Sequence, residues 1–125
     1  MSDDLPVVPP RRRGFVHVID AAGYSRAGLC RLWQEAAVRI ELLVAICGGL
    51  LLAWSGAKLS ELMIYAGLWL AVFIVETVNT ALEVLTDYVS PNYSQAAKEA
   101  KDLGSAAVGL SLCAPFLFLL WSLLT

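Results

Sequence analysis

Residues 42–53 read LLVAICGGLLLA and contain no charged side chain. They lie within a longer apolar stretch, residues 36–54, which as a helix is long enough to cross about 30 Å of hydrocarbon. Residues 60–85 and 101–123 form two further stretches in which apolar side chains dominate. The sequence therefore predicts an all-α membrane protein with three transmembrane helices.

The composition of the whole chain agrees with a membrane protein. Of its 125 residues, 58% are hydrophobic, which is more than a soluble globular domain with a polar surface contains. Six of the nine Lys and Arg residues fall within the first forty positions. Positively charged flanks stay on the cytoplasmic side of a membrane, so we predict a cytoplasmic N-terminus. We expect no nucleic-acid partner.

The segment before the first span differs in character from the rest of the chain. Residues 1–13 are rich in proline and charge, and we expect them to form a flexible cytoplasmic tail. Residues 14–30 are predicted to form an amphipathic helix on the membrane surface, since they are too polar to span it. Gly23 is expected to break this helix, and Ser25 to cap a second helix that continues into the first span. The apolar face of the surface helix consists of Phe15, Val18, Ile19 and Ala22.

The connections between the spans are short. An external turn at residues 55–58 is predicted to join the first two spans, and a polar cytoplasmic loop at residues 87–99 to join the last two. Residues 14–125 are expected to form a single membrane domain.

The second span carries an unusual polar face. A carboxylate in hydrocarbon costs at least about 2.5–3.5 kcal/mol, so it normally marks a functional site or a paired polar interior. Asp87 is the member of this face that most simply lines the water interface. The residues of the face follow a spacing of i, i+3, i+4, i+7 and i+11, and they are Glu76, Asn79, Thr80, Glu83 and Asp87.

Two more polar clusters are expected at the same membrane level. Glu35 and Arg39 lie four residues apart at the start of the first span, where an ordinary surface ion pair also explains them. The third span opens with a polar stripe at i, i+3, i+4 and i+7, formed by Lys98, Lys101, Asp102 and Ser105. The convergence of three clusters favours a functional site at the cytoplasmic interface.

Carboxylates, an amide and a lysine at one place suit phosphate chemistry. Magnesium prefers carboxylate and phosphate oxygens, and a lysine neutralises phosphate charge. Glu76 and Glu83 are roughly 10 Å apart along a helix that rises about 1.5 Å per residue, which is too far for two ligands of one ion. Glu83 therefore suits the metal, and the deeper Glu76 suits a base that accepts a proton from a lipid hydroxyl. No glycine-rich nucleotide motif is present in the sequence.

Four segments carry a resemblance to a known family. They are AAGYS at residues 21–25, WxEAAxRxE at 33–41, VExxNxAxE at 75–83 and AKDxGSAAV at 100–108. With these motifs the chain resembles the prokaryotic diacylglycerol kinases, small three-span enzymes that phosphorylate a membrane lipid alcohol. The resemblance extends over about residues 14–122.

The resemblance implies roles for individual residues. Glu76 matches the catalytic base, and Glu35 and Glu83 match ligands of Mg²⁺. The implied ATP-binding residues are His17, Tyr24, Glu35, Asn79, Glu83, Tyr93, Lys101 and Asp102. The implied substrate-binding residues are Ala21, Ala22, Gly23, Tyr24, Ser25, Arg39, Glu41, Glu76 and Ser105.

The resemblance also implies an assembly and a location. The family forms homotrimers whose active sites are shared between subunits, in the bacterial cytoplasmic (inner) membrane with the active site at the cytoplasmic face. The implied reaction converts ATP and diacylglycerol to ADP and phosphatidic acid.

Two departures and two alternatives accompany this interpretation. His17 stands where well-known members have an arginine, and the segment at residues 92–94 keeps only Tyr93 of a nucleotide-contacting loop. Residues 89–91 are instead similar to the undecaprenol kinases of the same family, which is one alternative activity. A non-catalytic helical bundle or transporter subunit is the other alternative, although a transporter is expected to carry charges near the membrane midplane.

Overall fold

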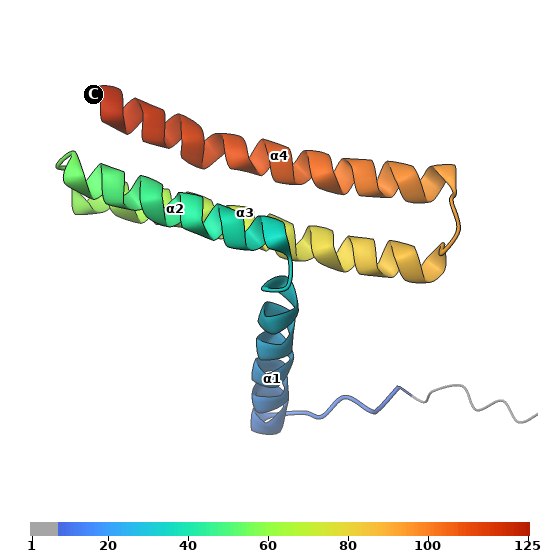
Figure 1. Cartoon of the computed structure of the whole chain (residues 1–125). Helices are drawn as coiled ribbons and strands as arrows, with labels where there is room; N and C mark the ends of the chain where they lie inside the picture. Colours follow the sequence, from blue (N-terminus) through green and yellow to red (C-terminus); the bar gives the residue numbers. More distant parts are fainter. Residues whose placement is uncertain (1–7) are drawn as a thin grey trace, which may run out of the picture. The chain divides into compact units, whose positions relative to one another are not determined.

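A computed structural model describes residues 8–125, and it is helical wherever it is regular (Figure 1). The helices are α1 (Phe15–Leu32), α2 (Ala36–Trp54), α3 (Leu59–Val89) and α4 (Gln95–Leu124). The chain divides into two compact units with the boundary after Arg31, so that α1 and the three long helices belong to different units. The predicted all-α architecture with three long apolar helices and an additional N-terminal helix is confirmed.

The three long helices are built to face lipid. Each of α2, α3 and α4 is long and apolar enough to cross a membrane. Large apolar side chains such as Leu43, Leu70 and Leu117 are more than 60% exposed, which in water would be a costly surface. A hydrocarbon environment removes that cost, because lipid tails are as apolar as these side chains.

The helices α2, α3 and α4 run antiparallel to their chain neighbours and lie side by side, with α3 and α4 in the most extensive contact (Figure 1). Their apolar core lies in the half nearest the α2–α3 turn and contains Leu52, Tyr65, Trp69 and Val72. The Trp69 ring meets Phe116 of α4 edge-on, with ring centroids 5.8 Å apart. Aromatic contacts of this kind supply the van der Waals packing that holds helices together in lipid.

Two glycines allow the helices to approach closely. Gly48 of α2 lies directly against the Tyr65 hydroxyl, and a Cβ at this position would overlap it. Gly104 of α4 lies in the same way against the side-chain oxygen of Asn79 on α3. Small residues at helix contacts are a general feature of membrane bundles, since they let backbones pack tightly. These two contacts therefore set the register of α3 against its neighbours.

The end of the bundle at the α2–α3 turn is tied by one carboxylate. Gly56 adopts a positive φ of 86° in the turn, and the Glu61 side chain accepts a hydrogen bond of 2.8 Å from the Lys58 backbone N–H. The same carboxylate accepts a 2.8 Å hydrogen bond from the Ser122 hydroxyl of α4. The start of α3 is thereby joined to the end of α4.

The prediction that Gly23 breaks the N-terminal helix is wrong. The helix α1 continues through Gly23 and Ser25 to Leu32, and the chain turns at residues 33–35, with Glu35 extended before α2. One glycine inside a helix costs only about 1 kcal/mol relative to alanine, which neighbouring helix formers offset. Ser25 is consequently a helical residue rather than a cap.

The predicted polar loop at residues 87–99 is also wrong in its extent. The helix α3 continues to Val89 and α4 begins at Gln95, so the connection is only residues 90–94. The two helices thus extend through these polar residues, beyond their apolar segments. Ser94 caps α4 by accepting a hydrogen bond from the Ala97 N–H, and Lys98 pairs with Asp102 one turn further on.

The predicted flexible tail at residues 1–13 falls partly on residues 1–7, which lie outside the described residues. Residues 8–13 belong to no helix or strand.

We predict that Gly48→Ala destabilises the bundle, whereas Gly49→Ala does not. A Cβ on Gly49 would meet Tyr65 at 3.6 Å, an ordinary van der Waals contact, but a Cβ on Gly48 overlaps the Tyr65 hydroxyl. Overpacking costs about 1–3 kcal/mol, more than the gain of about 1 kcal/mol in helix propensity. Thermal unfolding in detergent, followed by circular dichroism, should show a lower Tm only for Gly48→Ala.

Removing the Tyr65 hydroxyl provides the control. Tyr65→Phe in the Gly48→Ala background should restore part of the lost stability. Equal Tm values for Gly48→Ala and Gly49→Ala would contradict the close contact.

Candidate functional site

A polar cavity of about 290 Å³ lies among α2, α3 and α4, on the side of the apolar core that faces the α3–α4 connection. Four carboxylates line it, from Glu35, Glu41, Glu76 and Glu83. The other polar lining residues are Asn79, Thr80 and Ser105. This cavity thus collects most of the polar residues that the sequence pattern singles out.

Helix geometry explains why these residues meet. Glu76, Thr80 and Glu83 are spaced i, i+4 and i+7, so α3 presents them on one face. The antiparallel helix α2 places Glu41 beside Glu76, and six residues earlier Glu35 lies near the level of Glu83. The site therefore depends on the register between α2 and α3.

Glu76 is the most deeply buried acidic residue of the cavity. Its side chain is only 6% exposed, and its carboxyl group lies within hydrogen-bonding reach of that of Glu41. One oxygen of Glu41 is buried without a hydrogen-bond partner among residues 8–125. Buried polar oxygens are normally hydrogen-bonded, so an oxygen left without a partner here suits a cation or the hydroxyl of a ligand.

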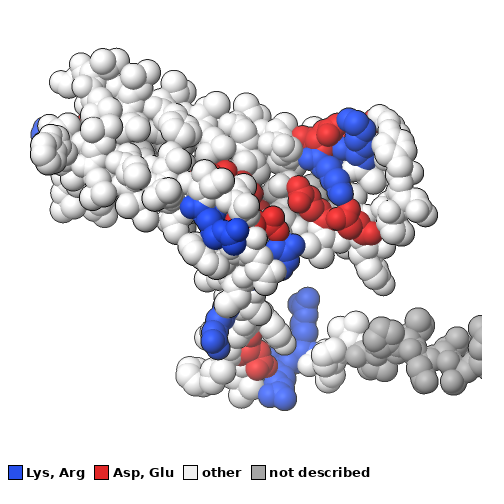
Figure 2. Space-filling view, viewed as in Figure 1, with Lys and Arg blue, Asp and Glu red and all other residues white. Residues whose placement is uncertain are grey.

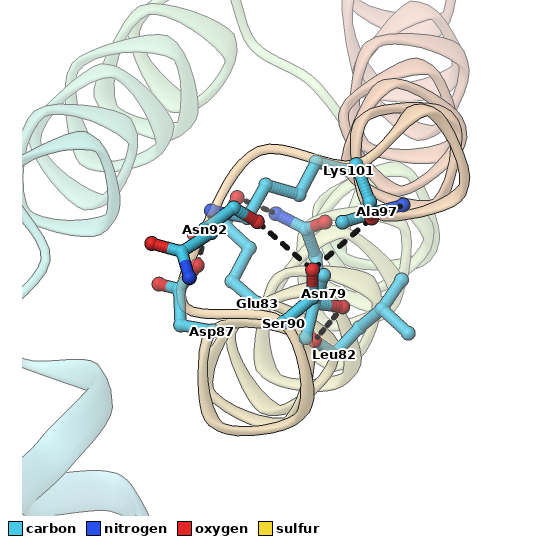
Figure 3. A network of polar contacts seen from close by, with 10 residues as sticks. Asn79, Leu82, Glu83, Asp87, Ser90, Asn92, Ala97 and Lys101 are labelled. Carbon is cyan, nitrogen blue, oxygen red and sulfur yellow. Dashed lines mark hydrogen bonds and ion pairs between the residues drawn. The ribbon is translucent and has the colours of Figure 1, made fainter.

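Asn79 orients the neighbouring carboxylate. Its side-chain nitrogen donates a hydrogen bond of 3.3 Å to Glu83 one turn further along α3, as Figure 3 shows. The Asn79 side-chain oxygen is buried without a partner within the described part of the chain. The hydrogen bond from Asn79 thus helps to hold Glu83 in place where it lines the cavity.

Ion pairs between α3 and α4 extend the site toward the connection. Lys101 of α4 pairs with Asp87 of α3, and it also lies close enough to Glu83 to interact with it electrostatically (Figure 3). Lys98 pairs with Asp102 on the surface of α4. On the face that Figure 2 shows, most charged side chains of this unit lie toward this end, and few are visible at the opposite end, where Lys58 and Glu61 lie.

The structure brings together only part of the predicted site. Glu35, Glu41, Glu76, Asn79, Glu83 and Ser105 share the cavity. Lys101 does not line the cavity but interacts electrostatically with Glu83, which does. Asp102 is exposed and forms an ion pair with Lys98. Tyr93 lies in the α3–α4 connection, is 80% exposed and donates a hydrogen bond to the Gln95 side chain. Arg39 donates a hydrogen bond to the Trp33 carbonyl oxygen.

The remaining predicted residues belong to the other unit. His17, Ala21, Ala22, Gly23, Tyr24 and Ser25 all lie on α1. Thr80 and Asp87 contribute to the site without having been predicted as site residues. Both lie on the polar face of α3 in the sequence pattern, which was the signal that could have identified them.

The cavity does not contain a metal site made by protein alone. Within residues 8–125, no group of three or more His, Cys, Asp or Glu side chains is arranged to hold a metal ion. Glu35 and Glu83 nevertheless line the same cavity, and both offer the hard oxygen ligands that Mg²⁺ prefers. Magnesium commonly takes one or two carboxylates and completes its shell with water and substrate phosphates, which these residues fit.

Comparisons with known proteins identify the family to which the chain is similar. The family model described as prokaryotic diacylglycerol kinase matches residues 23–123. A diacylglycerol kinase from Sinorhizobium is 39% identical over 78% of this chain and 71% of its own length. The Escherichia coli K12 diacylglycerol kinase is 34% identical over 87% of this chain and 93% of its own length.

A more distant relative carries the same name. The diacylglycerol kinase of Helicobacter pylori 26695 is 31% identical over 91% of this chain and 88% of its own length. The similarity therefore covers all three long helices instead of a single motif. The chain belongs to the prokaryotic diacylglycerol kinase family, a group of membrane lipid kinases that use ATP.

Proposed function

We propose that this protein transfers the γ-phosphate of ATP to the hydroxyl of diacylglycerol, giving phosphatidic acid and ADP. The observation that carries the proposal is the burial of Glu76 in the same cavity as Glu83 and Glu35. The names of the relatives support diacylglycerol as the lipid.

Glu76 acts as the general base in this proposal. Its depth in the bundle suits the hydroxyl of a membrane lipid, which approaches from the apolar layer. The lipid oxygen attacks the γ-phosphorus, its proton passes to the Glu76 carboxylate, and ADP leaves with the bridging oxygen. Glu41, which lies against Glu76, positions that carboxylate and the hydroxyl.

Glu35 and Glu83 are the proposed ligands of Mg²⁺, and the ion supplies charge neutralisation on the phosphates when it is bound. Asn79 keeps Glu83 oriented through its hydrogen bond. Lys101 is placed to neutralise further phosphate charge once it exchanges its partner Asp87 for nucleotide.

The other predicted contacts are retained as proposals. His17, Tyr24, Tyr93 and Asp102 are proposed to contact the nucleotide. The lipid is proposed to contact Ser105 and Arg39, together with the α1 segment Ala21, Ala22, Gly23, Tyr24 and Ser25.

We also propose that the protein is a homotrimer in a bacterial inner membrane, with its N-terminus and active site on the cytoplasmic side. The small residues Ala45, Gly49 and Ala53 are spaced four residues apart on α2 and are not buried within the described bundle, which supports self-association because small residues let the helices of two copies approach closely. The basic residues Arg11–Arg13 before α1 support the orientation, since basic flanks stay in the cytoplasm.

Replacing Glu76 by Gln tests the proposed base. The amide preserves the shape of the side chain but cannot accept the proton, so kcat should fall by about two or more orders of magnitude. Binding of MgATP should change little. Phosphate transfer from labelled ATP to diacylglycerol in mixed micelles gives the rate.

Glu61→Gln is the matched control, because Glu61 is on the same helix at the opposite end of the bundle. It should retain activity. A Glu76→Gln protein with activity within a few-fold of wild type would remove Glu76 from the role of base.

A second prediction concerns magnesium. Asn79→Ala should raise the magnesium concentration for half-maximal activity by about tenfold, because partners of metal ligands tune affinity to this extent. Glu35→Gln and Glu83→Gln should raise it at least as much, since each removes an anionic ligand. The measurement is a magnesium titration of the kinase activity at fixed ATP.

Glu99→Gln controls for the loss of a carboxylate near the α3–α4 connection. Glu99 is exposed and accepts a hydrogen bond from Gln95, outside the cavity. An unchanged magnesium requirement in both Glu35→Gln and Glu83→Gln would place the metal elsewhere.

A further inference from the structure

A second cavity lies within the unit that contains α1. Its volume is about 550 Å³, and its polar lining residues are Arg11, Arg12, His17, Asp20 and Tyr24. Arg11 and Arg12 come from the segment before the helix, and the other three come from α1 itself. Nothing in the proposed chemistry so far uses the two arginines.

Helix geometry separates this cavity from the apolar side of α1. His17, Asp20 and Tyr24 are spaced i, i+3 and i+7, so they share one face. The exposed side chains Phe15, Val18 and Ile19 project from the opposite face, which is suited to a membrane surface. The polar face consequently points away from the apolar face and can bind a polar ligand at the membrane boundary.

The arginines are brought to this face by the chain that precedes α1. Pro9 and Pro10 stiffen the segment, because each proline fixes its own φ. Gly14 then adopts a positive φ of 77°, and its carbonyl oxygen accepts a 3.0 Å hydrogen bond from the His17 N–H. Arg11 and Arg12, which precede this turn, line the same cavity as His17 and Asp20 of the first turns of the helix.

The charges in the cavity are not balanced. Two guanidinium groups face one carboxylate, that of Asp20, and neither Arg11 nor Arg12 forms an ion pair with any residue between 8 and 125. Figure 2 shows basic and acidic side chains gathered on this unit. Arginine is always charged and binds phosphate through paired N–H donors, so two arginines in one cavity with a single described carboxylate suit a phosphate group.

We propose that Arg11 and Arg12 form a phosphate-binding site with His17 and Tyr24, and that Asp20 weakens it by repulsion. The phosphate belongs either to a nucleotide or to the headgroup of an anionic lipid, since both are present at a membrane boundary. In the nucleotide case the inference rests on the proposed kinase function. The arginines then bind the phosphates of ATP, to which His17 alone binds weakly.

The test uses the full-length protein in a zwitterionic detergent, with MgATP and inorganic phosphate as soluble probes. Arg11→Gln and Arg12→Gln should each weaken binding by about tenfold, because each removes a charge-assisted hydrogen bond. Arg13→Gln is the matched control: it removes the same charge from the next residue, which does not line the cavity. It should change the dissociation constant by less than about twofold, since an exposed charge acts weakly through solvent.

Asp20→Asn provides a change of opposite sign. Removing the one carboxylate of the lining should tighten binding of the same probes several-fold. The expected pattern is weaker binding for Arg11→Gln and Arg12→Gln, unchanged binding for Arg13→Gln and tighter binding for Asp20→Asn. A general loss of positive charge cannot produce this pattern.

A lipid arm distinguishes the two sources of phosphate. Short-chain phosphatidic acid and short-chain phosphatidylcholine, added to the same detergent solution, are used as lipid probes with the same four variants. If the site takes a lipid headgroup, the variants alter binding of phosphatidic acid and leave MgATP binding unchanged. If the site takes the nucleotide, the variants alter MgATP binding and leave binding of phosphatidic acid unchanged. Arg11→Gln and Arg12→Gln then raise KM for ATP, while kcat at saturating ATP is retained.

Equal effects of Arg11→Gln, Arg12→Gln and Arg13→Gln in both arms would overturn the proposal. That failure is distinct from failure of the kinase function, which is decided by the Glu76→Gln turnover.

Discussion

The burial of one carboxylate, that of Glu76, is the constraint on which the rest of the structure depends. An ionisable side chain exposed to hydrocarbon is costly, so α3 must be covered by protein at this level. Glu41 approaches from α2, and Ser105 and Val108 of α4 line the same cavity. The contact of Gly104 with Asn79 lets α4 approach α3 closely enough to shield Glu76 from the surrounding lipid. The site is thus a consequence of how this bundle protects a polar helix face.

Packing and chemistry share one surface of α3. Its buried residues are Tyr65, Trp69, Val72, Glu76 and Thr80, which follow one another at spacings of three or four residues. The first three form the apolar core of the bundle, and the last two line the polar cavity. Because one stripe serves both purposes, the contacts that fix the helix register also fix the distance between the functional carboxylates. A small rotation of α3 would disturb both.

Most of the fold can be predicted from the sequence, but some contacts of the candidate site cannot. The three apolar stretches predict the long helices, and the spacing from Glu76 to Asp87 predicts a polar face, because both properties depend on local periodicity. The pairing of Glu41 with Glu76 is different, since it depends on the register that contacts such as Gly48 with Tyr65 impose. The helical state of Gly23 was missed because a lone glycine is tolerated within a helix.

Other features were missed for related reasons. Residues 87–89 and 95–99 were read as a loop, although residues 95–99 are good helix formers and Lys98 pairs with Asp102 one turn further on. The ion pair of Lys101 with Asp87 joins two helices and cannot be read from either helix alone. The most direct test of the account is transfer of labelled phosphate from ATP by the purified protein, with diacylglycerol or undecaprenol in matched micelles. The account predicts labelled phosphatidic acid and a higher kcat/KM for diacylglycerol, whereas a higher kcat/KM for undecaprenol, or ATP cleavage without a labelled lipid, would contradict it.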